Sequence, residues 1–125
     1  MGSDNDLQDD EAPTTVGGLR LSSVYRRLKP FVLDQVRGPG SPTEWQLEAP
    51  EIIVGRSHQA DISIDSHTLS RRHLVLRRLE GEYQVTDLDS ANGLYLNGVR
   101  AHSAVLREGD LMQIGDVVFV YHEGT

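Results

Sequence analysis

The chain has 125 residues, of which 38% are hydrophobic and 25% are charged, a composition typical of one globular domain with an extension. It carries a formal net charge of −7 and no cysteine, which excludes a disulfide framework and a thiolate metal site. The negative charge argues against general nucleic-acid binding, and no apolar run is long enough to span a membrane. The N-terminus lacks the pattern of a signal peptide, so we expect a cytoplasmic protein.

The first 29 residues are predicted to form a flexible acidic tail. Residues 1–18 contain few hydrophobic side chains and many acids, so they cannot bury enough apolar surface to offset the entropy of ordering. Apolar residues then recur at the spacing of one helical face, at Leu21, Val24, Tyr25 and Leu28. This spacing predicts one short helix near residues 21–29, which Pro30 would end.

Residues 30–125 are predicted to form a single domain of short strands. Strand-like segments recur about every 8–12 residues, with turn signals between them. They lie near residues 31–36, 45–49, 51–56, 61–64, 73–79, 82–88, 94–97, 104–106, 111–115 and 117–123. This spacing predicts an all-β sandwich of two twisted, mainly antiparallel sheets. Within 82–88, Tyr83, Val85 and Asp87 alternate with more polar positions, so we expect them on a buried face.

Polar residues suited to holding an anion stand at three predicted junctions between strands and loops. Arg56 follows Gly55 at the end of one strand, Ser70 and Arg71 precede another, and Asn92 begins a turn. Arginine offers a planar fork of donors that stays charged, and loop N–H groups add further donors. Because the loops of a sandwich gather at its ends, these residues are expected to converge into a compact anion pocket.

Four motifs in this order resemble the forkhead-associated (FHA) domain family. They are Gly55-Arg56, Ser70-Arg71-Arg72-His73, Asn92-Gly93 and Asn97-Gly98. The segments "DISI", "TDLDSANGLYLNG" and "LREGDLMQIG" lie between and after them, and the resemblance covers about residues 30–123. It implies an FHA-type β-sandwich in a small signalling protein that binds phosphothreonine peptides, and hence an adaptor in serine/threonine kinase signalling rather than an enzyme.

The resemblance also implies a role for each motif residue. Arg56 and Ser70 would contact the phosphate, Arg71 would add a contact to phosphate or peptide backbone, and Asn92 would bind the main chain of the ligand. The structural members would be Gly55, His73, Gly93, Asn97 and Gly98, with His73 bracing the Ser70 loop. Expected partners are phosphothreonine-containing proteins, including a serine/threonine kinase, with neither nucleic acid nor membrane among them. No cofactor and no metal are expected.

Two positions depart from the family pattern and keep an alternative open. Ala91 and Leu94 stand where the family often has threonines, before and after the first Asn-Gly pair. The alternative is an FHA-fold scaffold for phosphate-independent association between proteins or copies of itself.

A metal site at His58, Asp61, His67 and His73 matches no ligand spacing of a finger or helical motif. A hydrolase built on Ser70 lacks the nucleophile-elbow context.

Thr14 and Thr15 lie in the acidic tail, in the sequence "DDEAPTTVGG". Some small bacterial FHA proteins are similar, with a threonine pair that is phosphorylated so that the tail folds onto its own domain. The resemblance therefore implies an intramolecular partner, the tail itself, and regulation by phosphorylation of Thr14 or Thr15.

Overall fold

The structure is a computed structural model that describes residues 15–16, 19–20 and 29–125. In the tail, β2 (Thr15–Val16) and β3 (Leu19–Arg20) pair as a short antiparallel hairpin. Thr14 lies outside the described residues, as does nearly all of the helix expected near residues 21–29. No described residue is helical, and accordingly no helix in this part of the chain could cross a membrane.

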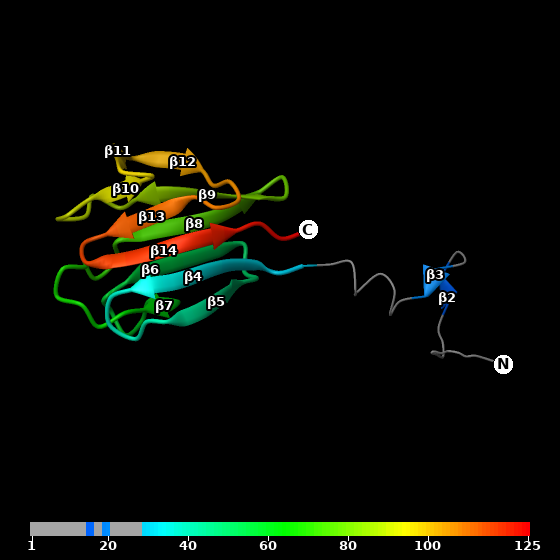
Figure 1. Cartoon of the computed structure of the whole chain (residues 1–125), viewed down its shortest axis with the longest axis horizontal. Helices are drawn as coiled ribbons and strands as arrows, with labels where there is room; N and C mark the ends of the chain where they lie inside the picture. The colour runs from blue at the N-terminus through cyan, green and yellow to red at the C-terminus, as the bar shows by residue number, and fades with distance from the viewer. Residues whose placement is uncertain (1–14, 17–18, 21–28) are drawn as a thin grey trace. The chain divides into compact units, whose positions relative to one another are not determined.

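Two sheets stack as the layers of a sandwich (Figure 1). The six-stranded sheet has the order β11 (Val99–Ala101), β10 (Leu94–Leu96), β13 (Leu111–Ile114), β14 (Val117–His122), β4 (Phe31–Arg37), β5 (Thr43–Leu47). The five-stranded sheet has the order β12 (Ser103–Val105), β9 (Glu82–Asp87), β8 (Leu74–Leu79), β6 (Glu51–Gly55), β7 (Ile62–Ser63). All pairings within these two sheets are antiparallel except that of β6 with β7. The predicted all-β sandwich of two mainly antiparallel sheets is confirmed.

The core lies between the two sheets and follows the alternation of the strands. In β9, Tyr83, Val85 and Asp87 are buried, as the sequence pattern predicts. The Tyr83 ring meets Phe31 of the other sheet edge-on, with 5.3 Å between ring centroids, and its hydroxyl donates to the Ala49 carbonyl at 2.7 Å. The Arg78 guanidinium covers the Phe31 ring at 4.4 Å, which adds a cation–π contact at the border of the core.

Two tight turns fix the register of the hairpins near the core. Asn97 and Gly98 both have positive φ, 52° and 83°, and form the two-residue loop between Leu96 and its partner Val99. Such a loop suits the right-handed twist of paired strands, which is why Asn-Gly favours it. Glu80 and Gly81 form the corresponding loop between β8 and β9, again with positive φ.

Gly55 ends β6 at a point where another backbone segment crosses it closely. A Cβ atom at this position would lie 2.1 Å from the Arg71 carbonyl oxygen, although the φ of Gly55 is not positive. On either side, the His73 N–H donates to the Val54 carbonyl at 2.9 Å and the Arg56 N–H donates to the Ser70 carbonyl at 3.0 Å. The absence of a side chain therefore lets residues 54–57 lie directly against residues 70–73.

We expect Gly55→Ala to lower the free energy of unfolding by about 3 kcal/mol, because the methyl group would have to push two hydrogen-bonded backbones apart. Urea denaturation followed by tryptophan fluorescence measures this change. The matched control is Gly109→Ala, at a glycine with φ of +83° and no atom within 4 Å of an added Cβ. That variant should lose only about 1 kcal/mol, the cost of a left-handed conformation. A Gly55→Ala protein as stable as the wild type would contradict this account.

Candidate functional site

Three loops meet at one end of the sandwich and bring the predicted anion-binding residues together. They are residues 56–57 after β6, residues 64–73 between β7 and β8, and residues 88–93 between β9 and β10. Backbone bonds join the first two loops, from Arg56 N–H to the Ser70 carbonyl and from Ser57 N–H to the Arg71 carbonyl at 3.1 Å. The Ala91 N–H donates to the Ser70 hydroxyl oxygen at 2.9 Å and so joins the third loop to the second.

His73 is fully buried beneath these loops and connects two of them. Its Nδ1 accepts the Ser70 N–H at 3.1 Å, and its Nε2 lies 2.8 Å from the Gly93 carbonyl oxygen. Because a carbonyl can only accept, Nε2 carries the hydrogen and the ring is the neutral tautomer. The hydrogen bond to Ser70 involves its backbone and not its hydroxyl. The pair therefore lacks the contact between base and nucleophile that a serine hydrolase requires.

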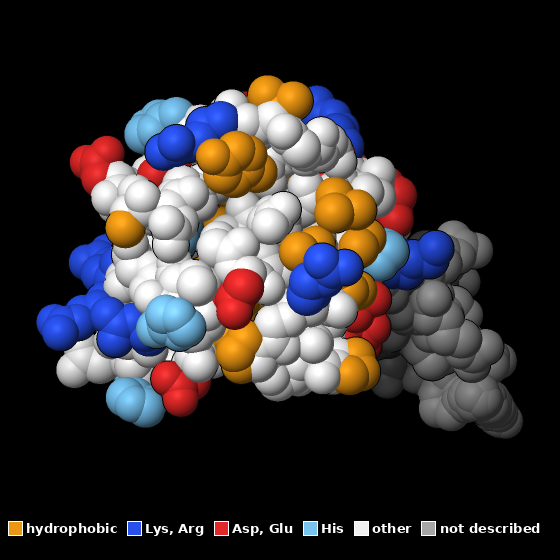
Figure 2. All heavy atoms as spheres, turned by 60° about the vertical axis from the view of Figure 1, so that its left-hand side comes forward, with side chains coloured by type: hydrophobic (Ala, Val, Ile, Leu, Met, Phe, Trp, Pro, Cys, Tyr) orange, Lys and Arg blue, Asp and Glu red, His pale blue; other side chains and the backbone are white. Residues whose placement is uncertain are grey.

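The cationic and hydroxyl groups of the site keep donors that the protein does not use. Arg56 is partly buried, and its Nε donates to the Leu69 carbonyl at 3.2 Å, which fixes the base of the guanidinium and leaves its terminal nitrogens available. The Ser70 hydroxyl accepts from Ala91, so its own hydrogen can point to a ligand. Arg71 is exposed, and its guanidinium makes no hydrogen bond or ion pair with the described residues. Figure 2 shows a group of basic and histidine side chains along the left edge of the surface it draws, and further basic side chains at the top and on the right.

Asn92 is bound to the loop that carries Ser70. Its side-chain Nδ2 donates to the Thr68 carbonyl at 2.7 Å, so the amide orientation is fixed and Oδ1 stays free to accept. Gly93, next to it, has φ of +81°, and an added Cβ would lie 2.5 Å from Nε of Arg100. Ser90 supports the turn, since it donates to Asp87 at 2.5 Å and accepts the Gly93 N–H at 2.8 Å.

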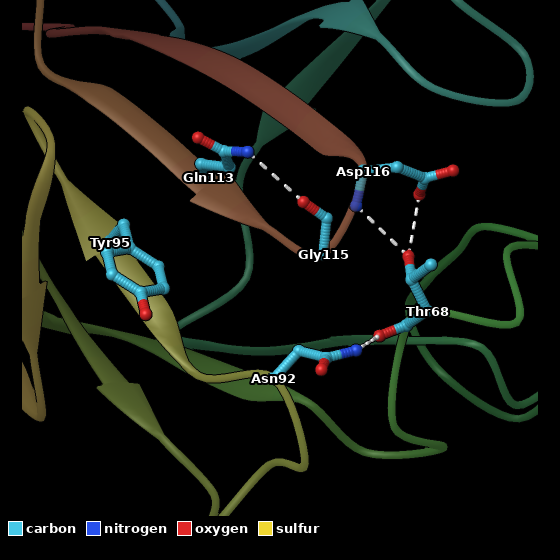
Figure 3. A pocket seen from close by; sticks show the side chains of 6 residues that line it. All are labelled: Thr68, Asn92, Tyr95, Gln113, Gly115 and Asp116. Carbon is cyan, nitrogen blue, oxygen red and sulfur yellow. Dashed lines mark hydrogen bonds between the residues drawn. The ribbon is translucent and has the colours of Figure 1, made fainter.

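The structure adds a group that sequence reasoning missed, Asp116 in the turn between β13 and β14. Its Oδ1 accepts a hydrogen bond from the Thr68 hydroxyl at 2.7 Å, and its N–H donates to the same hydroxyl (Figure 3). The Ser66 hydroxyl also donates to Oδ1, at 2.6 Å. These hydroxyl bonds, that of Ser66 first, hold the pKa of Asp116 below its usual value. Gly115 leaves room for this contact, because an added Cβ would lie 2.3 Å from the Thr68 hydroxyl oxygen. None of the four sequence motifs contains Asp116, and its partner Thr68 is 48 residues away in the sequence.

Asn97 and Gly98 lie apart from these loops, in the turn between β10 and β11. The Asn97 amide donates to Asp110 at 3.0 Å and accepts the Leu111 N–H at 2.9 Å. This pair therefore fastens the turn to the start of β13 and contributes no group to the anion site.

Comparison with known proteins places this geometry in a family. The model of the FHA domain matches residues 52–115. The oxoglutarate dehydrogenase inhibitor of Corynebacterium jeikeium is 36% identical over 118 residues, which cover 94% of this chain and 77% of that protein. The glycogen accumulation regulator GarA of Mycobacterium tuberculosis is 35% identical, with 94% and 74% covered. The oxoglutarate dehydrogenase inhibitor of Corynebacterium diphtheriae is 41% identical over 70% of this chain, and the match spans only 62% of that relative.

Solved structures agree with the sequence matches. The chain is similar to an FHA domain from a study of phosphothreonine-dependent FHA interactions, with a TM-score of 0.69, 26% identity, and 75% and 96% of the two chains covered. It is also similar to the FhaA FHA domain complexed with the intracellular domain of Rv3910, with a TM-score of 0.68, 27% identity, and 74% and 99% covered. The family match, the relatives and the shared fold confirm the resemblance seen in the four motifs. The chain belongs to the FHA domain family.

Proposed function

We propose that this protein is a phosphothreonine-binding adaptor in serine/threonine kinase signalling, with residues 30–125 as its binding domain. The observation that carries the proposal is the convergence of Arg56, Ser70 and Asn92 at one loop end, cross-linked by backbone hydrogen bonds. The site offers a guanidinium, a hydroxyl and an amide around one small area, which suits a phosphate ester on a peptide. It presents no pair of nucleophile and base, so the proposed activity is binding and not catalysis.

Each proposed contact uses a group that the protein leaves unpaired. The terminal nitrogens of Arg56 and the hydroxyl hydrogen of Ser70 would bind phosphate oxygens, and the exposed Arg71 would add a second guanidinium. Asn92 Oδ1 would accept a main-chain N–H of the peptide, since its Nδ2 is already bound to Thr68. Three or four such bonds, less the cost of ordering a peptide, correspond to a dissociation constant on the order of micromolar.

The related proteins support a regulatory role through protein partners. Those named above are an inhibitor of oxoglutarate dehydrogenase and a regulator of glycogen accumulation, and one similar FHA domain was solved with an intracellular domain of another protein. We therefore expect phosphothreonine-containing proteins as partners, among them a serine/threonine kinase, and a location in the cytoplasm. No cofactor, nucleic acid or membrane has a part in this proposal.

The tail is the proposed regulator of the site. Thr15 pairs with Arg20 in the hairpin, and about nine residues separate Arg20 from Lys29, so a flexible linker of that length would span roughly 16 Å on average. A phosphorylated Thr14 or Thr15 would then act as a tethered ligand at a local concentration of about millimolar. That concentration exceeds a micromolar dissociation constant, so the tail would exclude peptides from outside.

Replacing Arg56 with alanine should weaken binding of a phosphothreonine peptide at least about tenfold, because a charge-assisted hydrogen bond to phosphate is lost. Isothermal titration calorimetry with a phosphopeptide library member and its unphosphorylated twin measures the effect. Arg77→Ala is the matched control, since it removes the same charge from an exposed pair with Glu51 at 2.8 Å, away from the loop end. Equal affinity of Arg56→Ala and the wild type for the phosphopeptide would refute the proposed site. Equal affinity of the wild type for the phosphopeptide and its unphosphorylated twin would favour the phosphate-independent scaffold.

Binding should weaken as the pH falls below about 6, the second pKa of the phosphate, because the ligand then loses one of its two charges. Affinity is thus fully present above this pH and declines below it. Fluorescence anisotropy at several pH values gives the midpoint. A phosphonate analogue with a lower second pKa distinguishes titration of the ligand from titration of a protein group. With this analogue, the pH midpoint of binding should move to lower pH. An unmoved midpoint would mean that a group of the protein governs the dependence.

Phosphorylation of the tail by a threonine kinase should reduce capture of an external phosphopeptide, because the tethered phosphothreonine occupies the same site. The comparison is between the wild type and a Thr14→Ala/Thr15→Ala double variant, treated with the same kinase and assayed for peptide capture. The double variant should keep full capture. Undiminished capture by the phosphorylated wild-type protein would argue against this switch and leave the binding site itself untouched.

A further inference from the structure

The outer face of the six-stranded sheet carries a row of apolar side chains. Strands β13, β14 and β4 lie side by side in this layer (Figure 1). On β14, Val118 and Val120 face away from the core, since neither belongs to the cluster between the sheets. Leu111 pairs with Val120, and Val36 is the β4 residue that the bulge beside Val118 leaves without a partner. Leu111 is 47% exposed and Val36 is 49% exposed, so these four residues form an accessible apolar patch, here called the β14 stripe.

Two carboxylates stand beside this stripe. Asp34 on β4 and Glu44 on β5 are directly opposite each other in the register. Their neighbours Leu33 and Trp45 pack toward the core, so both acids lie on the outer face. Neither carboxylate forms a hydrogen bond or an ion pair with any described residue. Because like charges directly opposite in a sheet are destabilising, this acidic pair weakens the free domain and would be relieved by a cation.

The basic groups of the same face do not neutralise the acidic pair. His122 is engaged with Glu108, whose Oε2 lies 2.8 Å from its Nδ1. Arg37 is opposite Val118 in the register, and no ion pair among residues 29–125 joins either basic residue to the acidic pair. The charge beside the β14 stripe is therefore negative and uncompensated within the described part of the chain.

The position of the stripe within the sheet indicates the kind of ligand it fits. Strands β13, β14 and β4 each have a neighbouring strand on both sides, so a ligand on this face would be recognised through side chains and not by strand addition. A helix satisfies its own main-chain hydrogen bonds and is about 10 Å wide. Since β4 and β5 lie about 4.8 and 9.6 Å from β14, a helix over the stripe would bring one of its flanks to the acidic pair.

We propose that this face binds a basic amphipathic helix of a partner protein. Apolar residues of the helix would cover the β14 stripe, and lysine or arginine side chains on one flank would lie beside the acidic pair. No residue of the stripe or of the acidic pair belongs to the three loops of the phosphate site, so the two sites can be occupied together. An adaptor joins two proteins. The proposed phosphothreonine site accounts for one of them, and this face would account for the second.

Fluorescence anisotropy with a labelled amphipathic helical peptide of leucine and lysine tests the proposal. Its matched control carries glutamate in place of every lysine. The wild-type protein should bind the lysine peptide at least about tenfold tighter than the glutamate peptide, and added salt should reduce the difference. A saturating phosphothreonine peptide should leave this affinity unchanged. Equal affinities for the two helices, or displacement by the phosphothreonine peptide, would overturn the inference.

The double variant Asp34→Asn/Glu44→Gln tests the acidic pair. Its affinity for the lysine peptide should fall about three- to tenfold, while its urea midpoint should rise because the like-charge repulsion is gone. The matched control is Glu80→Gln/Glu82→Gln, which makes the same charge change at exposed positions of the β8–β9 hairpin in the other sheet and should keep the affinity. An unchanged affinity in the first variant, or an equal loss in the control, would contradict a role for this pair in binding.

Leu111→Ser tests the β14 stripe at a side chain that does not fill the core, and it should weaken binding of the lysine peptide about three- to tenfold. Val36→Ser provides a second test if the first variant lowers the urea midpoint. Full affinity in both variants would overturn the inference. Sedimentation velocity of the wild type identifies the other possible occupant: a dimer that Leu111→Ser abolishes would mean that a second copy of the chain covers this face. Helix binding that persists when no phosphothreonine peptide binds would refute the proposed function and leave this inference standing.

Discussion

His73 is completely buried, and its two ring nitrogens make hydrogen bonds of opposite polarity to two different loops. Nδ1 accepts from the backbone of Ser70, and Nε2 donates to the backbone of Gly93. Asp87 lies 4.0 Å from Nε2, so a carboxylate also stands on the donating side of the ring. A ring of any other chemistry could not accept at one point and donate at the other with this spacing, so the relative position of the two loops depends on this side chain.

The remaining bonds of the site extend the same arrangement. Arg56 is held through its N–H and its Nε by the Ser70 and Leu69 carbonyls, and Asn92 is held by the Thr68 carbonyl. Each side chain with a proposed contact to phosphate or peptide is thus positioned by the main chain of a neighbouring loop, with Arg71 as the exposed exception. Groups fixed before the ligand arrives lose less conformational entropy on binding, which favours a well-defined binding geometry.

Much of the fold could be predicted because its signals are local. Asn97-Gly98 and Glu80-Gly81 form the expected two-residue turns, and Tyr83 and Val85 face the core as their alternation predicts. Strand β11 had no such signal, since Val99 and Arg100 are both exposed and no alternation marks the strand. The parallel pairing of β6 with β7 also could not be predicted, because it depends on how the intervening loop folds back.

The site shows the same division between local and long-range information. Gly55, Arg56, Ser70, His73 and Asn92 belong to short motifs, so a sequence can show that they act together before their distances are known. Asp116 belongs to no such motif, and its contact with Thr68 arises only when the turn after β13 reaches the loop before β8. Its hydrogen bonds to this loop could therefore be recognised only from the side-chain positions.

The loop of residues 88–93 begins in the five-stranded sheet and ends in the six-stranded sheet, whereas Ser70 belongs to a loop between two strands of the five-stranded sheet. The proposed site therefore straddles the seam between the layers. A guest that touches both Ser70 and Asn92 would oppose any sliding of one layer over the other. A peptide bound at this site would therefore restrict the motion of the two sheets relative to each other, including strands that it does not contact.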